Sequence, residues 1–393
     1  MRGTLRLFYA FRLLATSYLF VPIFMLFQAA RGLDFADGLA LGGIYCGVVI
    51  VVEVPTGVLA DRLGRRRAMF VGALAMVAAC LVASSAHAFT TFAVAESLAA
   101  ISMALCSGAD SAYLYDLLAR HDRTRDYARH EAIASAWHLA GSAIACAGGG
   151  ALAQIDLVLP YYATAGVAII AAVIAIALPD EAAAAPANRT LRGWTRDMVT
   201  ALGEVGKNGR LAWLVGYSTV VFVLLRATIY IYQPYLAHRG LGVVGIGLVY
   251  AAGFVVAAAV ASRTHVLRSR FGDDTLLWAL LGTLAASFVG LAGAAPGPWL
   301  LGLLVVQAIA NGIFSPLTKP LLNREIADSS RRAAVLSVES MARRLAMGVF
   351  SPLVGLYGES DVMMLCGAVG IAGFALLAMA RFRRGVPAPI DPS

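Results

Sequence analysis

The stretch Gly57-Val58-Leu59-Ala60-Asp61-Arg62-Leu63-Gly64-Arg65-Arg66-Arg67 decides the fold class of this chain. It places an acid between two glycines, followed by a block of arginines, where one long apolar run ends and the next begins. In a membrane protein such a sequence forms a tight turn between two transmembrane helices, and the positive-inside bias holds its arginines on the cytoplasmic side. The stretch therefore predicts a helical hairpin in a membrane.

The composition independently indicates a membrane protein. Of the 393 residues, 60% are hydrophobic and 14% are charged, and the mean hydropathy is +0.77. A soluble domain carries about 25% charged residues. The net charge of +8 comes from basic residues in short loops between apolar runs, which predicts orientation in a membrane rather than nucleic-acid binding. The five cysteines lie within apolar runs, at spacings unlike those of zinc ligands or disulfides, so we expect no metal site.

Twelve apolar runs are long enough to cross a bilayer, whose core takes about 20 helical residues. The first run exceeds the ~7–15-residue apolar core of a signal peptide, so we interpret it as the first span. The predicted runs lie near residues 5–29, 38–59, 68–86, 91–118, 132–153, 158–178, 211–237, 243–262, 275–293, 298–318, 333–356 and 362–381.

The basic residues predict the orientation of these spans. With the N-terminus inside, only Arg31 and Arg239 of the 31 Lys and Arg fall on the outer side. Four more lie within spans, and all the others fall on the inner side. Cytoplasmic loops carry such an excess, so we expect both termini in the cytoplasm. The prediction is an all-α membrane protein with twelve transmembrane helices.

The longest connection, near 179–210, divides the runs into two groups of six. Within it, Leu191, Trp194, Met198 and Leu202 share one helical face, which predicts an amphipathic helix at the inner membrane surface. The predicted parts are an N-terminal half (1–180), a cytoplasmic linker (181–210), a C-terminal half (211–381) and a cytoplasmic tail (382–393).

The two halves also repeat weakly. Arg62-Leu63-Gly64 recurs as Arg270-Phe271-Gly272 at an offset of 208, and the small-residue run from Gly141 to Gly150 has a counterpart from Gly348 to Gly355 at an offset of 207. The near-equal offsets predict a duplicated six-helix unit, hence two pseudo-symmetric halves.

Residues 57–67 resemble the loop motif of the major facilitator superfamily, G-x-L-x-D-R-x-G-R-(K/R), and fill every position of it. The segments 53–57, 107–116 and 332–337 resemble a bacterial subgroup of that superfamily. The fifth run is similar to the antiporter motif G-x-x-x-G-P-x-x-G-G, but Ala145 and Cys146 replace its Gly and Pro. The fourth-span arginine motif is absent, and that region carries Glu96. The resemblance implies the superfamily's fold and alternating access, while the two departures weaken a transfer of drug-efflux function.

The resemblance also implies a cytoplasmic latch, in which an acid at the inner end of span four pairs with the loop arginine. The alternative is that the basic turn serves topology alone. The latch residues that the resemblance implies are Gly57, Asp61, Arg62, Gly64, Arg65 and Asp116.

Ionisable residues within spans are candidates for proton coupling, because a charge at mid-bilayer costs about 2.5–3.5 kcal/mol even on insertion scales. Glu96, Met103 and Asp110, at i, i+7 and i+14, would share one helical face, and Arg12 and Glu53 lie at similar depth to Asp110. We predict a buried cluster that binds and releases a proton; the alternative is a permanent ion pair between helices.

Two polar stripes in the C-terminal half are candidates for the substrate cavity, which the resemblance implies is lined by spans one, four, seven and ten. Polar contacts between helices are the alternative. The glycine-rich face of span five, with Pro352 in span eleven, is predicted to be a packing motif. The candidates are Thr219, Arg226, Tyr230, Gln233, Gln307, Asn311 and Ser315 for the cavity, and Gly141, Gly149, Gly150 and Pro352 for packing.

No phosphate-binding loop, nucleophile elbow or metal cluster occurs in the sequence, so we predict neither an enzyme nor a cofactor. The predicted function is proton-coupled movement of a small organic solute, with export favoured over uptake. The alternatives are a proton-coupled nutrient or vitamin symporter and, from another class, a non-transporting sensor or lipid flippase. We expect a multi-pass monomer in the cell inner membrane, with the solute, protons and the lipid bilayer as partners.

Overall fold

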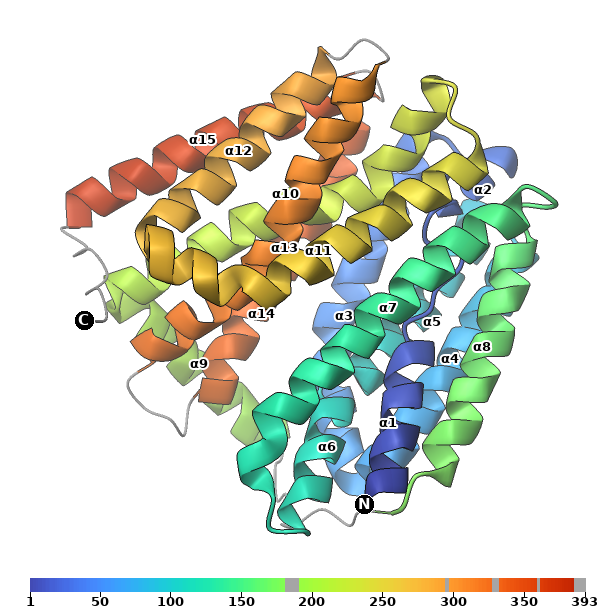
Figure 1. The fold of residues 1–393 in the computed structure, drawn as a ribbon, viewed down its shortest axis with the longest axis vertical. Helices are drawn as coiled ribbons and strands as arrows, with labels where there is room; N and C mark the ends of the chain where they lie inside the picture. The colour runs from blue at the N-terminus through green and yellow to red at the C-terminus, as the bar shows by residue number, and fades with distance from the viewer. Residues whose placement is uncertain (181–190, 294–296, 327–331, 359–360, 385–393) are drawn as a thin grey trace. The chain divides into compact units, whose positions relative to one another are not determined.

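A computed structural model describes residues 1–180, 191–293, 297–326, 332–358 and 361–384, and its regular elements there are helices (Figure 1). In chain order, the helices of the first part are α1 (Arg2–Leu14), α2 (Phe24–Ala30), α3 (Phe35–Leu63), α4 (Arg65–Ser84), α5 (Phe89–Cys106), α6 (Ala109–Ala119), the 3-10 turn η1 (Thr124–Asp126), α7 (Tyr127–Ala153) and α8 (Leu159–Ala177). They are followed by α9 (Leu191–Lys207), α10 (Gly209–His238), α11 (Val243–Phe271), α12 (Asp273–Ala292), α13 (Pro298–Glu325), α14 (Arg332–Gly355) and α15 (Val362–Arg384).

Each of the twelve predicted runs is occupied by helix, but the first and the fourth are interrupted. The first consists of α1 and α2, joined by the irregular segment 15–23. The fourth consists of α5 and α6, because Ser107 is extended and Gly108 has a φ of 85°, a left-handed conformation that glycine adopts without strain. Residues 107 and 108 therefore change the helical register within that span.

Among the described residues, nine helical segments are long and apolar enough to cross a membrane. The other three predicted spans are the interrupted first one, α7 and α14. Segment α14 carries Glu339, Arg343 and Arg344, and α7 is rich in glycine and alanine, so both are less apolar than a typical span. The chain is an all-helical membrane protein.

Glycines in the inter-helix turns reveal the repeat more clearly than the sequence alone. Gly64 and Gly272 each have positive φ, 91° and 74°, at the start of α4 and α12. Gly32 and Gly240, within the repeated Arg-Gly-Leu triplets 31–33 and 239–241, have φ of 89° and 81°. Both glycine pairs are separated by 208 positions, so turn geometry as well as sequence recurs in the two predicted halves.

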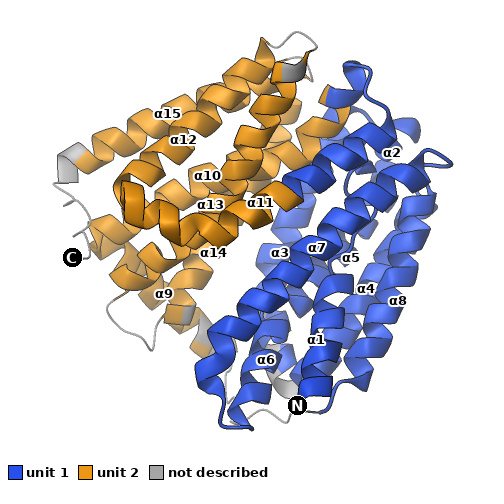
Figure 2. Ribbon diagram, viewed as in Figure 1, with its two compact units in different colours: residues 1–191, 236–254 blue, residues 192–235, 255–393 orange. Residues whose placement is uncertain are grey.

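The described chain packs as two compact units, one of residues 1–191 and 236–254 and the other of residues 192–235 and 255–393 (Figure 2). In the first unit, an apolar core joins α1, α4, α6 and α8. The rings of Phe8 and Tyr113 stack there with centroids 6.0 Å apart, and the Tyr113 hydroxyl donates to the Pro179 carbonyl at 3.1 Å. This core fixes α1 against α6, and the polar residues of the site follow one turn further along α1.

Candidate functional site

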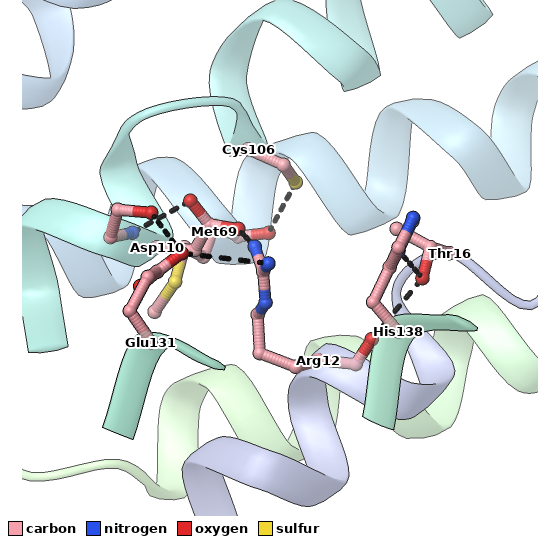
Figure 3. A network of polar contacts seen from close by, with 8 residues as sticks. Arg12, Thr16, Met69, Cys106, Asp110, Glu131 and His138 are labelled. Carbon is pink, nitrogen blue, oxygen red and sulfur yellow. Dashed lines mark hydrogen bonds and ion pairs between the residues drawn. The ribbon is translucent and has the colours of Figure 1, made fainter. Parts of the chain in front are cut away.

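A network of polar side chains in the first unit surrounds Arg12, on the last turn of α1 (Figure 3). Its guanidinium Nη1 donates to Asp110 Oδ2 on α6, and its Nη2 lies 3.9 Å from Glu131 Oε1 on α7. The Arg12 side chain is 15% exposed and that of Asp110 is 11% exposed. One cation and two acids from three helices thus meet among apolar residues, as buried charges require.

The break between α5 and α6 determines how Asp110 is presented. Because α6 restarts at Ala109, Asp110 lies in its first turn, where the helix dipole favours an anion. The Ser111 backbone N–H donates to Asp110 Oδ1 at 2.7 Å. The prediction that Glu96, Met103 and Asp110 share one face of one helix was wrong, because residues 107 and 108 interrupt the helix that it assumed.

Sequence reasoning missed Glu131, because the predicted fifth span began at residue 132, whereas α7 begins at Tyr127. Glu131 Oε1 accepts a hydrogen bond from the Ser111 hydroxyl at 3.0 Å. Its other oxygen, Oε2, is buried without a hydrogen-bond partner in the described part of the chain. The sequence did contain a pattern that could have identified Glu131. Glu131 precedes His138 by seven residues, so the two share the face of α7 that meets α1.

Three further hydrogen bonds lie along the seam between α7 and the chain from α1 to Thr16. The His138 Nδ1 lies 2.6 Å from Thr16 Oγ1, and the Thr16 hydroxyl donates to the Arg12 carbonyl at 3.1 Å. Because a hydroxyl has one hydrogen, His138 Nδ1–H is the donor to Thr16. Nearer the start of α7, the Tyr9 hydroxyl lies 2.5 Å from His130 Nδ1. Helix α7 therefore holds the backbone at Arg12 in place through His138 and Thr16, and it also supplies Glu131.

The glycines of α7 allow its backbone to approach its neighbours closely. A Cβ at Gly141 would collide with the Leu13 carbonyl, and one at Gly149 with the Leu19 carbonyl. A Cβ at Gly150 would lie 2.7 Å from the Val243 carbonyl oxygen of α11. The fourth residue of the predicted packing motif, Pro352, is half-buried within α14.

The predicted latch residues lie at the ends of α3, α4 and α6. Arg65 Nε is 3.9 Å from Asp116 Oδ2, which places the loop arginine beside the acid of α6. Gly64 ends α3 and begins α4 with φ 91° and ψ 144°, whereas a Cβ at Gly57 would meet open space. The side chains of Asp61 and Arg62 lie outside the described residues.

The remaining predicted carboxylates are half-buried at other positions: Glu53 on α3 and Glu96 on α5. In the described contacts, Arg12 is associated with the acids of α6 and α7.

The members of the two polar stripes in the second unit differ in how deeply they are buried. Gln307 is buried, where its Nε2 donates to Ser287 Oγ at 2.9 Å and its Oε1 accepts from the Tyr232 hydroxyl. Gln233 is fully buried, and its amide donates to the Ile229 carbonyl at 3.0 Å. This geometry corresponds to the helix-packing alternative. The other stripe members comprise buried Tyr230, half-buried Thr219, Arg226 and Ser315, and exposed Asn311.

The second unit also contains a buried ion pair outside the predicted site. Arg343 Nη2 lies 3.0 Å from Glu339 Oε2, one turn away on α14. The Ser218 hydroxyl donates to Glu339 Oε1, and the Arg343 guanidinium lies 5.0 Å from the centre of the Phe222 ring. Glu339 thus joins α14 to α10.

Comparisons with known proteins agree with this fold. The family model described as Major Facilitator Superfamily matches residues 7–351. A point mutant of the nucleoside transporter NupG superposes with a TM-score of 0.83 at 14% identity, covering 96% of this chain and 99% of that chain. A mutant of the peptide transporter POT in complex with sulfate superposes at 0.78 with 15% identity, covering 98% and 94% of the two chains. A search of curated proteins finds no match.

Proposed function

The chain belongs to the major facilitator superfamily, whose members carry small solutes across membranes and are not enzymes, and we propose that this member couples the solute to protons. The solute is a small organic molecule, and the protein works by alternating access. We place it as a monomer in the cell inner membrane, with two six-helix halves and the linker 181–210 in the cytoplasm.

The observation that carries the proposal is the buried cluster of Arg12, Asp110 and Glu131. Replacing a buried ion pair by apolar residues is often neutral or stabilising, so stability alone does not explain three charges at the junction of α1, α6 and α7. Ionisable groups at membrane depth mark proton and substrate pathways. A carboxylate whose environment alternates can bind a proton on one side and release it on the other.

The alternation itself is assigned to the predicted latch. The Arg65 and Asp116 pair, beside the glycine turn at residue 64, connects the ends of α4 and α6 in one state of the cycle. Breaking such a pair redistributes two conformations that differ by a few kcal/mol. The solute would contact the stripe members that are not buried, namely Thr219, Arg226, Asn311 and Ser315.

Export is the proposed direction. The glycine face of α7, which resembles the antiporter motif except at Ala145 and Cys146, packs on the α1 backbone beside the charged cluster. An antiporter exchanges incoming protons for outgoing solute, whereas the alternative nutrient symporter moves both inward.

Reconstitution into proteoliposomes that contain a trapped pH-sensitive dye tests the proposal. Solutes of several classes are added to vesicles holding wild-type protein or the Arg12→Met variant. We expect at least one solute to move protons with the wild type and not with the variant. Solute movement that is indifferent to the pH gradient would exclude coupling. A protein that binds a solute without moving it would be a sensor.

A further inference from the structure

The two carboxylates at Arg12 are not equivalent, and we propose that Glu131 takes the coupling proton while Asp110 stays ionised as the fixed counter-ion of Arg12. This assignment rests on the proposed proton-coupled function and goes beyond it by naming the group that titrates.

Asp110 has every feature that stabilises an anion. One oxygen accepts from the Arg12 guanidinium, and the other accepts from the Ser111 N–H at 2.7 Å. Its position in the first turn of α6 adds the favourable helix dipole. Protonating Asp110 would weaken all three interactions and leave Arg12 without its direct partner.

Glu131 is held more weakly. It lies 3.9 Å from Arg12 Nη2, beyond hydrogen-bond distance, and its one hydrogen bond comes from the Ser111 hydroxyl. Its Oε2 is buried without a hydrogen-bond partner among the described residues, an arrangement that costs a charged carboxylate more than a neutral acid. The side chain is nevertheless 27% exposed, compared with 11% for Asp110, so water can deliver a proton to it.

The charge of the cluster favours the uptake of one proton. With both acids ionised, Arg12, Asp110 and Glu131 together carry one net negative charge, and adding a proton to Glu131 brings the cluster to neutrality without breaking the Arg12–Asp110 pair. The proton comes from hydronium in the aqueous phase: one hydronium O–H bond breaks and leaves water, as an O–H bond forms on a Glu131 carboxylate oxygen. Release reverses this step.

The other groups around Glu131 do not replace it in this role. Tyr127, one turn before it, and Cys106, at the end of α5, carry a phenol and a thiol, which are ordinarily neutral near pH 7. The described hydrogen bonds of the α7 histidines are made elsewhere, by His130 with Tyr9 and by His138 with Thr16, so protonating either histidine would add a cation and leave Glu131 charged.

Infrared difference spectroscopy of the solubilised full chain, titrated with acid, tests the assignment without any solute. We expect the wild type to develop a carboxylic-acid C=O band that Glu131→Gln lacks. Asp110→Asn should keep the band and shift its midpoint to lower pH, because Glu131 then becomes the sole carboxylate partner of Arg12. Ser111→Ala should shift the midpoint upward by about one pH unit, because ionised Glu131 loses its hydrogen-bond donor.

The opposite pattern overturns the assignment. A band that disappears in Asp110→Asn and persists in Glu131→Gln would make Asp110 the carrier, and a band that survives in both variants would exclude both. Glu131→Asp, which keeps an acid at the position, should retain a titrating band even if Glu131→Gln fails to fold. A Glu131 band in a protein that moves no protons with any solute would instead refute the proposed function and leave the titration assignment standing.

Discussion

At the scale of single residues, Arg12 links the fold to the proposed chemistry. It contacts an acid from α6 and lies beside another from α7, so it fixes the junction of three helices as well as the local charge. The sequence predicted Arg12 and Asp110 because charges within apolar runs are conspicuous. It did not predict Glu131, because hydropathy locates the start of a span only to within a few residues.

Replacing Arg12 alone should therefore destabilise the protein more than replacing Arg12 and Asp110 together. We expect Arg12→Met to lose about 3–5 kcal/mol of stability, because two carboxylates remain without a cation, and Arg12→Met/Asp110→Asn to lose less. Denaturant unfolding in detergent measures both. Equal losses in the single and the double variant would contradict the ion pair.

A second prediction at this scale concerns the backbone conformation of Gly64. Its φ of 91° and ψ of 144° lie in a region that is essentially confined to glycine, although the space around it is open. We expect Gly64→Ala to lose about 1–3 kcal/mol and to impair transport. Gly166→Ala, in the interior of α8 with nothing near its Cβ, is the matched control. Equal thermal stability of the two variants would show that residue 64 carries no strain.

At the scale of helices, the positions of the spans were predictable and their interruptions were not. Apolar content locates a span, but the segment 15–23 is more apolar than α1, which carries three arginines, and still forms no regular helix. Only Pro22 and the Ser107-Gly108 step gave local signs of the two breaks. The predicted helix of the linker is present as α9, where Met198 is buried and Leu202 is exposed; its location at the membrane surface stays a prediction.

Helix packing around α7 gives a matched pair of variants. A Cβ at Gly149 would collide with the Leu19 carbonyl, whereas one at Gly148 would only touch the Leu19 side chain, at 3.7 Å. We expect Gly149→Ala to lower the melting temperature by several degrees. Gly148→Ala should be neutral or stabilising, because alanine favours helix by up to about 1 kcal/mol over glycine. Thermal unfolding of the two variants side by side decides the matter, and equal melting temperatures would refute the close approach.

At the scale of the whole molecule, two turns with left-handed glycines recur at a spacing of 208 residues, which is consistent with the predicted duplication of a six-helix unit. The first turns of α4 and α12 each form an ion pair at equivalent positions of this repeat, but the basic residue of α4 is replaced by an acid in α12. Arg66 pairs with Asp180 at 3.1 Å, and Asp274, 208 positions later, pairs with Arg381 at 2.6 Å. The recurring sequence landmarks and their near-equal offsets predicted the repeat. The ion pairs were not predictable, because they depend on where the helices end, which no sequence pattern located.

The orientation of the chain is a separate prediction. In a variant without native cysteines, Gly193→Cys should react with an impermeant thiol reagent only after the cells are opened, whereas Arg239→Cys should react in intact cells. Labelling of position 193 from outside would reverse the assignment made from the basic residues.

The central claim is that the buried charges at Arg12 couple solute movement to protons. It is tested most directly by measuring solute accumulation in proteoliposomes under an imposed pH gradient, alongside solute exchange at equal pH. We predict that the wild type accumulates solute above equilibrium, and that Glu131→Gln exchanges solute but no longer accumulates it. Undiminished gradient-driven accumulation by Glu131→Gln and Asp110→Asn alike would contradict the account.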